Sequence, residues 1–407
     1  MLGALTRLMG GVDLANIIDY VLWRGDLPAR QVPLGEADAL ILSYLSYMPM
    51  DGIVPGEEGG EPVTLRDAAL AMLERSEREN GPLACSVKDD RRLLAALAQS
   101  VRFGTMRLCA FVNRLDGEAE EQFSAVTFLP PAGPAFIAYR GTDNTVVGWQ
   151  EDFNMCFESE VPAQRDAVAY AERMAGTVLG GLILGGHSKG GNLAAYAELF
   201  VGAETHRRIQ AVYNFDGPGF NEEIVASAAF TQRKRCVQTF VPQSSIVGVL
   251  MENDEVMTVV RSDGVSIFQH NPYTWQVMGG SFVALPERTD SSHFADATVK
   301  HWLSSLSPDV RRRAIDGIFE VLGASDGRNV AELFEPRKAM GVLRAAGSMD
   351  DETRRAVEET FRLLGEALGK NVSVWMNRTV NRTADDLRQR VFGERMQESR
   401  PEDDGEH

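Results

Sequence analysis

The sequence predicts an α/β protein built on a mostly parallel, doubly wound sheet, with helical segments before and after it. Between residues 135 and 241, short apolar strands alternate with helical patterns, and this β-α-β-α order is typical of a parallel sheet. The flanking regions instead have apolar residues at helical spacing. We therefore expect an N-terminal helical segment at 1–104, a core at 105–300, a C-terminal helical extension at 301–395, and a disordered acidic tail at 396–407.

Helices are expected throughout the N-terminal segment. In ADALILSYLSY, Leu40, Ile41, Tyr44 and Leu45 share one helical face. The expected helices cover residues 37–47, 64–78 and 89–101. The Gly/Pro-rich stretch MPMDGIVPGEEGGEP between the first two is expected to be a loop.

Strand patterns begin near residue 105. MRLCAFVNRL and EQFSAVTFLP alternate around the polar turn Asp116-Gly117-Glu118, which predicts a hairpin, and PAFIAYRG follows as a third strand. Later strands are expected at 182–184, 211–215, 237–241, 256–261 and 265–269, the last two flanking the turn Ser262-Asp263-Gly264. Helices are expected between the strands at 163–175, 192–200 and 222–230.

The C-terminal extension contains one clear helix signal. Ser348 and Asp351 have the spacing of a capping box. An apolar stripe follows, formed by Val357, Phe361, Leu364 and Leu368. We expect this stripe to pack on the body of the protein, although a partner-binding face would show the same pattern.

Composition excludes several classes of function. The net charge of −17 disfavours general nucleic-acid binding and stable binding to anionic membranes. No signal-peptide cleavage site is evident, and no apolar run reaches the roughly 18 residues of a membrane-spanning helix. Cys85, Cys109, Cys156 and Cys236 show no C-x-x-C spacing, so we expect free thiols. These features predict a cytoplasmic protein without a transmembrane segment.

A glycine-rich turn holds the candidate nucleophile. GLILGGHSKGGNLAAYAE contains G-x-S-x-G centred on Ser188, with an apolar strand before it and an Ala-rich helix after it. A nucleophile elbow has this strand-turn-helix context, and Gly186, Gly190 and Gly191 would let strand and helix approach closely. The alternative is a turn that binds phosphate or nothing, but the loop lacks the G-K-[ST] ending of a P-loop.

The candidate base comes from six histidines. Four of them are disfavoured by their positions. His187 lies inside the elbow itself, and His206 follows the next helix, at the opposite end of the sheet. The other two are His301, in the C-terminal helical segment, and His407, in the tail. His270 ends the predicted strand VSIFQH, and a hydrolase sheet takes its base from the loop after a late strand. His293 in RTDSSHFAD instead has the pattern of a helix start. We therefore favour His270 and keep His293 as the alternative.

The candidate acid is Asp216. It ends the strand AVYNF at the same sheet edge as Ser188, although a turn-forming aspartate would also fit the sequence Asp-Gly-Pro-Gly. Asp254 and Asp263 are less well placed. The following strand VQTFV runs into PQSSIVG, which contains no acid.

Two backbone N–H groups are candidates for an oxyanion hole. One is that of Lys189, directly after the predicted nucleophile, and the other is that of Thr142 in the strand-end loop Arg140-Gly141-Thr142. The hydroxyl of Thr142 could donate as well. A capping or turn threonine is the alternative for this residue.

These motifs resemble a known group of enzymes. The run YRGT at 139–142, followed by Trp149 and Asp152, is similar to the F-R-G-[ST]…W…D stretch of the class 3, fungal-type lipases, and GGHSKGGNLA to their G-H-S-x-G-G elbow. NIIDYVLWRGD, VPQSSIVG and QHNPYTWQV resemble an uncharacterised bacterial family of lipase-like α/β-hydrolases. The resemblance implies an α/β-hydrolase-like fold, with Ser188 as nucleophile, Thr142 in the oxyanion hole and His270 as base.

The sequence departs from the class 3 pattern at the acid. Those lipases have an aspartate in a D-x-V-P segment after the strand that matches VQTFV, where this chain has PQSSIVG. Some other lipases hold the acid one strand earlier, in a turn that matches Asp216. The triad Ser188–Asp216–His270 is therefore the prediction, with a Ser–His dyad or a degenerate site as the alternative.

The predicted function is that of a serine esterase or lipase-like hydrolase. It would cleave a small-molecule or lipid ester or thioester through an acyl-enzyme on Ser188, with no metal or cofactor. The N-terminal helices are expected to form part of the acyl pocket. The alternative is a catalytically degenerate hydrolase-fold protein that binds a lipid or a partner protein, with the C-terminal helices as docking surface.

Overall fold

The structure is a computed structural model that describes residues 15–293 except 82, 85, 118–120, 143–150, 152–153, 156–157, 159, 253–255, 265 and 291. The described residues belong to the first of the two units into which the chain divides, Met1–Glu359. Several sequence predictions concern residues outside the described part: the C-terminal helical extension and tail, Cys85, Cys156, Trp149, Asp152, Asp254, His301 and His407.

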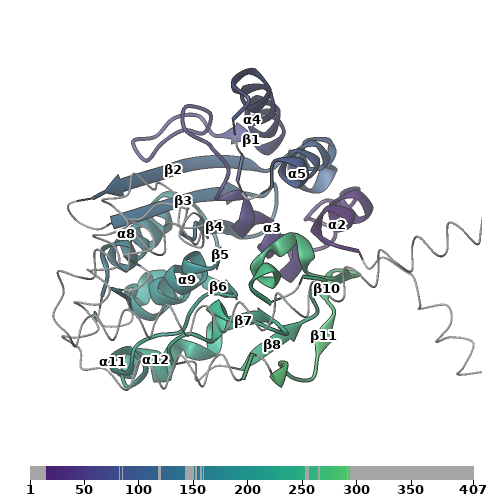
Figure 1. Cartoon of the computed structure of the whole chain (residues 1–407). Coiled ribbons are helices and arrows are strands. Elements are labelled where there is room, and N and C mark those ends of the chain that lie inside the picture. Colours follow the sequence, from purple (N-terminus) through teal and green to yellow (C-terminus); the bar gives the residue numbers. More distant parts are fainter. Residues whose placement is uncertain are drawn as a thin grey trace, which may run out of the picture. The chain divides into compact units, whose positions relative to one another are not determined.

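One mixed sheet forms the centre of the described part (Figure 1). Its strands, in spatial order, are β1 (Val63–Thr64), β2 (Arg107–Asp116), β3 (Glu121–Leu129), β4 (Ala135–Tyr139), β5 (Leu182–His187), β6 (Ile209–Phe215), β7 (Val237–Pro242), β8 (Met257–Val260) and β11 (Ala284–Leu285). Strands β4 to β8 pair in parallel, and the remaining pairs are antiparallel. The fold is α/β-hydrolase-like, as the sequence predicts.

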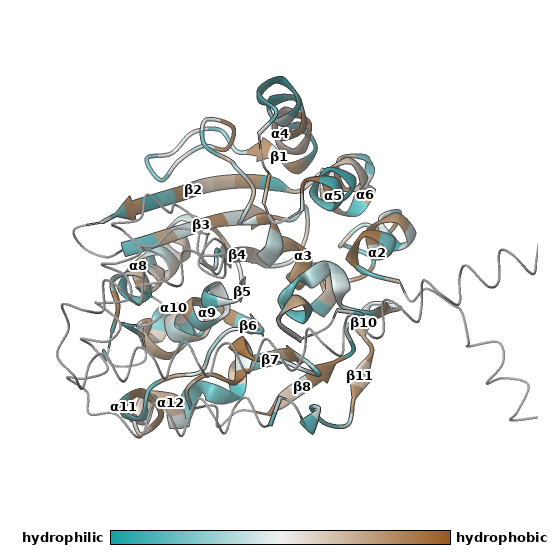
Figure 2. Ribbon diagram, in the orientation of Figure 1, coloured by the Kyte–Doolittle hydropathy of each residue, from teal (hydrophilic) through white to brown (hydrophobic). Residues whose placement is uncertain are grey.

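Helices cover both faces of the sheet. The first face carries helices of the N-terminal segment: α2 (Ile17–Arg24), α3 (Glu36–Leu45), α4 (Leu65–Glu79), α5 (Val87–Gln99) and α6 (Val101–Gly104). The second face carries α8 (Pro162–Thr177), α9 (Lys189–Phe200) and α12 (Ala228–Arg233), with the short α10 (Ala203–His206) and α11 (Glu222–Val225) nearby. Figure 2 shows hydrophobic and hydrophilic stretches on both α4 and α5, as expected for helices with one buried face.

Two apolar clusters divide the core between these faces. The first joins α2 to α5 with sheet residues such as Phe136 and Phe215. The second joins α8 and α9 with Ile137 and Leu184. Since neighbouring strand residues point to opposite faces, Phe136 and Ile137 contribute to different clusters. The N-terminal helices are therefore part of the main core of the protein.

Most predicted elements are confirmed, but two predictions are wrong. The predicted strand at 265–269 is a 3₁₀ helix, η3 (Ser266–His270), and β8 pairs with β11 instead. The amide of Gln269 donates to the carbonyl of Gly264, and the indole of Trp275 donates to the carbonyl of Gln269, which closes this segment on itself. The predicted helix at 222–230 is two short helices, because the side chain of Ser227 caps a new helix start by accepting from Phe230 N.

No helix in the described ranges is both long and apolar enough to cross a membrane. Of the cysteines that the structure describes, Cys109 and Cys236 carry free thiols.

A second, two-stranded sheet pairs β9 (Val277–Met278) with β10 (Ser281–Phe282), after a short 3₁₀ helix η4 (Pro272–Thr274).

Candidate active site

Ser188 lies at a sharp turn between β5 and α9. Its backbone has φ 58° and ψ −135°, a conformation that is strained for a residue with a side chain. The turn is held by two hydrogen bonds: Ser188 N donates to the carbonyl of Phe215 (2.9 Å), and Gly191 N donates to the carbonyl of Ser188 (2.8 Å). This backbone geometry is that of a nucleophile elbow.

Glycines bring three segments together around Ser188. A Cβ atom on Gly190 would overlap the carbonyl of Tyr139, so α9 can start against the end of β4 only with glycine at this position. A Cβ atom on Gly141 would lie 3.0 Å from the Cβ atom of Ser188. The loop after β4, which contains Thr142, therefore lies directly beside the elbow.

The predicted acid and base are in contact. Asp216 follows β6, also with a positive φ of 52°, and its Oδ2 atom lies 2.7 Å from His270 Nδ1. Asp216 is buried, whereas the side chain of His270 is 25% exposed. A carboxylate accepts, so Nδ1 of a neutral His270 carries the proton and Nε2 is left as the acceptor. This is the tautomer that a general base requires.

The second oxygen of Asp216 is held by the segment PQSSIVG. Ser245 Oγ donates to Asp216 Oδ1, and Gly248 N donates to the same atom at 3.1 Å. The segment that lacks the acid of the class 3 lipases thus binds the carboxylate one strand earlier. Sequence reasoning missed Ser245, because nothing local marks a serine whose partner is 29 positions away.

His187 is buried beside His270. The ring centroids of the two histidines are 4.4 Å apart, and His187 Nε2 lies 2.8 Å from the carbonyl oxygen of His270. The hydroxyl of Tyr47 lies 3.2 Å from His187 Nδ1. Burial lowers the pKa of His187 well below 6.5, and the neighbouring His270 lowers it further. Sequence reasoning missed Tyr47, which comes from the loop after α3.

The other candidates lie elsewhere. His293 is exposed, with Nδ1 3.4 Å from an Arg288 nitrogen, and residues 290, 292 and 293 are helical, in line with the sequence prediction of a helix start there. His206 lies 2.8 Å from a Glu198 carboxylate oxygen, shortly before β6 begins and so at the opposite end of the sheet. Asp263 accepts from the amide of Gln276.

Lys189 has two distinct environments. Its backbone N–H belongs to the first turn of α9, next to Ser188, where N–H groups point out of the helix end. Its side chain is buried and forms an ion pair of 2.7 Å with Glu151, which is buried as well. The ammonium group also donates to the carbonyl of Gln122 at 2.9 Å. The sequence predicts the backbone position but not this buried ion pair.

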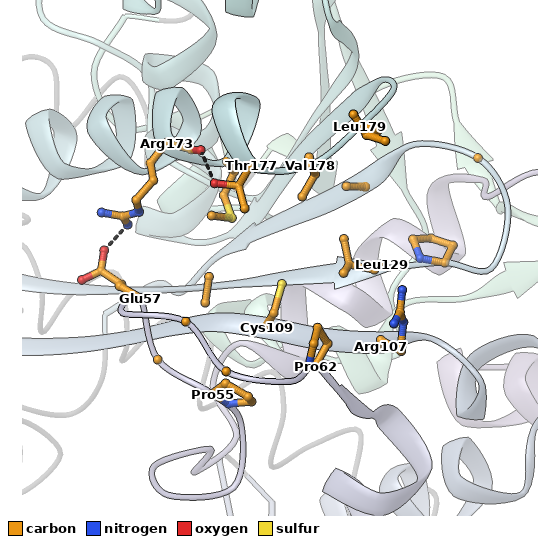
Figure 3. Close-up of a pocket in the computed structure, with 18 residues that line it drawn as sticks. Pro55, Glu57, Pro62, Arg107, Cys109, Leu129, Arg173, Thr177, Val178 and Leu179 are labelled. Carbon is orange, nitrogen blue, oxygen red and sulfur yellow. Dashed lines mark hydrogen bonds and ion pairs between the residues drawn. The ribbon is translucent and has the colours of Figure 1, made fainter.

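A cavity of about 410 Å³ lies at a different place in the fold (Figure 3). Its lining includes Ala135, the first residue of β4, and Leu179, which precedes β5, whereas Ser188 follows the carboxyl end of β5. Figure 3 shows the ion pair of Arg173 with Glu57 at one side of this cavity. None of the predicted site residues lines it.

Comparisons with known proteins find a matching family and matching solved structures. No curated protein matches the chain. Among solved structures, the chain is similar to the crystal structure of M37 lipase, with 14% identity, a TM-score of 0.32, and coverage of 53% of this chain and 70% of that one. The Mbeg1-like family model matches residues 97–320, which is more than half of the sequence and includes the elbow, Asp216 and His270. The chain therefore belongs to the Mbeg1-like family.

Proposed function

We propose that this protein is a serine hydrolase that cleaves an ester or thioester through an acyl-enzyme on Ser188. In this proposal His270 is the base and Asp216 orients it. The main support is the 2.7 Å contact between His270 Nδ1 and Asp216 Oδ2, at the same sheet edge as the strained elbow of Ser188. A merely turn-forming aspartate would not need a histidine partner and two further donors.

The proposed reaction has two steps. Ser188 Oγ attacks the carbonyl carbon while His270 Nε2 takes its proton, and the resulting tetrahedral intermediate carries one negative charge on the former carbonyl oxygen. The imidazolium then gives this proton to the leaving alcohol or thiol, and the acyl group stays on Ser188. In the second step, water attacks the acyl carbonyl carbon with His270 again as base, and the carboxylic acid product is released as Ser188 regains its proton.

The oxyanion would be held by the backbone N–H groups of Lys189 and Thr142. The start of α9 next to Ser188 supports this role for Lys189, since helix N-termini favour negative charge. The close approach of Gly141 to Ser188 supports the neighbouring Thr142. One such donor is typically worth about 3 kcal/mol of transition-state stabilisation.

Hydrolysis of p-nitrophenyl butyrate tests the proposal, with His293→Gln as matched control for His270→Gln. We expect His270→Gln to lower kcat/KM at least about 10³-fold, or about 4 kcal/mol, and His293→Gln to change it less than about twofold. An equal loss in both variants would contradict the choice of base. A folded wild-type protein that hydrolyses neither this ester nor its thioester analogue would favour the alternative, a hydrolase fold that only binds a lipid or partner.

A further inference from the structure

We propose that His187 is a positioning residue for His270 and that Tyr47, from the N-terminal segment, holds His187 in the tautomer that this role requires. The inference rests on the proposed function of His270 as base. It gives the N-terminal segment a role in the site that differs from lining an acyl pocket.

The contacts determine the tautomer of His187. A carbonyl oxygen only accepts, so the 2.8 Å contact with the His270 carbonyl requires a proton on His187 Nε2. The ring is buried and its pKa is lowered, which leaves it neutral with a single N–H. Nδ1 is then an acceptor, and the hydroxyl of Tyr47 lies 3.2 Å from it and 3.1 Å from the carbonyl oxygen of His187, so these two acceptors share the single hydroxyl proton. Without this donor, buried Nδ1 would lack a hydrogen-bond partner, so the preference for the proton on Nε2, which binds the His270 carbonyl, would weaken.

His270 is consequently held from two sides. Its ring forms a hydrogen bond with Asp216 through Nδ1, and its backbone carbonyl accepts a hydrogen bond from His187, the residue directly before the predicted nucleophile. The two rings, with centroids 4.4 Å apart and planes tilted by 36°, are in contact, which further limits rotation of the His270 side chain. Both restraints fix the direction in which Nε2 points, and a displacement of about 1 Å in such a group can cost roughly 10²-fold in rate.

A second anchor keeps the same loop folded without Tyr47. Three residues after His270, the hydroxyl of Tyr273 donates to buried Asp90 at 2.8 Å, and Asp90 also accepts from Tyr44 at 2.8 Å. Asp90 lies on α5 and Tyr44 on α3, so this anchor also comes from the N-terminal segment. Removing the Tyr47 hydroxyl should therefore move the base slightly while the loop stays in place.

Tyr47→Phe tests the proposal, with Tyr20→Phe as matched control. Tyr20 lies in the same segment, and its hydroxyl donates to buried Asp38 at 3.0 Å, away from the histidines. With p-nitrophenyl butyrate, we expect Tyr47→Phe to lower kcat about 5- to 10-fold with KM within twofold of wild type. Tyr20→Phe should keep kcat within twofold despite a similar loss of thermal stability. Unchanged kcat in Tyr47→Phe, or an equal loss in both variants, would overturn the proposal.

Nitrogen-15 NMR of histidine-labelled protein gives a readout that does not depend on activity. At pH 7 we expect wild-type His187 to be neutral with its proton on Nε2, and Tyr47→Phe to show a mixture of tautomers. A protonated His187, or one with the proton on Nδ1, would overturn the proposal even in an active enzyme. If the wild-type protein hydrolyses no ester, the proposed function fails, while these spectra still decide whether Tyr47 sets the tautomer.

Discussion

Asp216 illustrates how single contacts define the chemistry of this site. One carboxylate oxygen contacts His270, and the other accepts from Ser245 and Gly248 of the loop after β7. These donors fix the plane of the carboxylate and therefore the plane in which the imidazole lies. A single strand-end aspartate thereby acquires the geometry that its proposed role as orienting acid requires, from a segment that has no acid of its own.

Replacing Ser245 should disturb this geometry, and Ser244 offers a matched control. Ser245→Ala removes a hydrogen bond to a carboxylate, so we expect kcat/KM for p-nitrophenyl butyrate to fall about tenfold, or about 1.4 kcal/mol. The hydroxyl of Ser244 instead contacts Thr289, and Ser244→Ala should stay within about twofold. Equal effects in the two variants would mean that Ser245 does not act through Asp216.

His187 should make stability depend on pH. The native state keeps His187 neutral well below the pH at which the unfolded chain protonates it, so the unfolded chain binds the proton first as the pH falls below about 6.5. The stabilising contribution of neutral His187 is thus present above this pH and is lost on acidification, at up to about 1.4 kcal/mol per pH unit. Urea unfolding between pH 7 and 5 should show a steeper loss of stability in wild type than in His187→Gln, which keeps only the contributions of other groups such as His206, whose pKa is also lowered. Parallel pH profiles would contradict it.

At the scale of elements, the elbow depends on the packing of β4, β5 and α9. Gly190→Ala would force a methyl group into the carbonyl of Tyr139, so we expect a loss of at least about 2 kcal/mol of unfolding free energy, or failure to fold. Gly176 in α8 has open space where a Cβ atom would lie. Gly176→Ala should therefore be neutral or stabilising by up to about 1 kcal/mol. Urea unfolding distinguishes the two, and a neutral Gly190→Ala would be inconsistent with this packing.

Sequence patterns predict the structure of the elbow well and that of the segment carrying His270 poorly. Strand, glycine turn and helix around Ser188 are adjacent in sequence, so their local pattern determines their structure. The segment before His270 alternates like a strand, but its conformation depends on Gly264 and Trp275, which its own pattern does not reveal. Tyr47 contacts His187 across 140 positions, a pairing that a single sequence does not indicate.

At the scale of the whole molecule, the N-terminal helices complete the fold around a buried ion pair. Arg102 donates to both carboxylate oxygens of Asp38 at 2.6 Å, and neither side chain is exposed beyond 1%. Arg102 also donates to the carbonyl of Val32 at 2.9 Å, which ties the loop between α2 and α3 to α6. The segment that carries Tyr47 is therefore fastened to the core through this pair.

Breaking this pair should destabilise the protein strongly. Asp38→Asn leaves a buried guanidinium without its counter-charge, so we expect a loss of about 3–5 kcal/mol in the free energy of unfolding. Glu79→Gln is the control, because Glu79 pairs with Arg78 in solvent and the substitution should leave the free energy of unfolding nearly unchanged. If urea unfolding gave comparable losses of unfolding free energy in the two variants, the buried pair would contribute no more to stability than the exposed pair, contrary to the prediction.

The central claim, a nucleophilic Ser188 at this elbow, is tested most directly by fluorophosphonate labelling. The probe reacts with serines that an adjacent base activates, and mass spectrometry locates the modified residue. We expect a single adduct on Ser188 in wild type, none in Ser188→Ala, and strongly slowed labelling in His270→Gln. Folded wild-type protein that stays unlabelled, or an adduct that persists in Ser188→Ala, would contradict the claim.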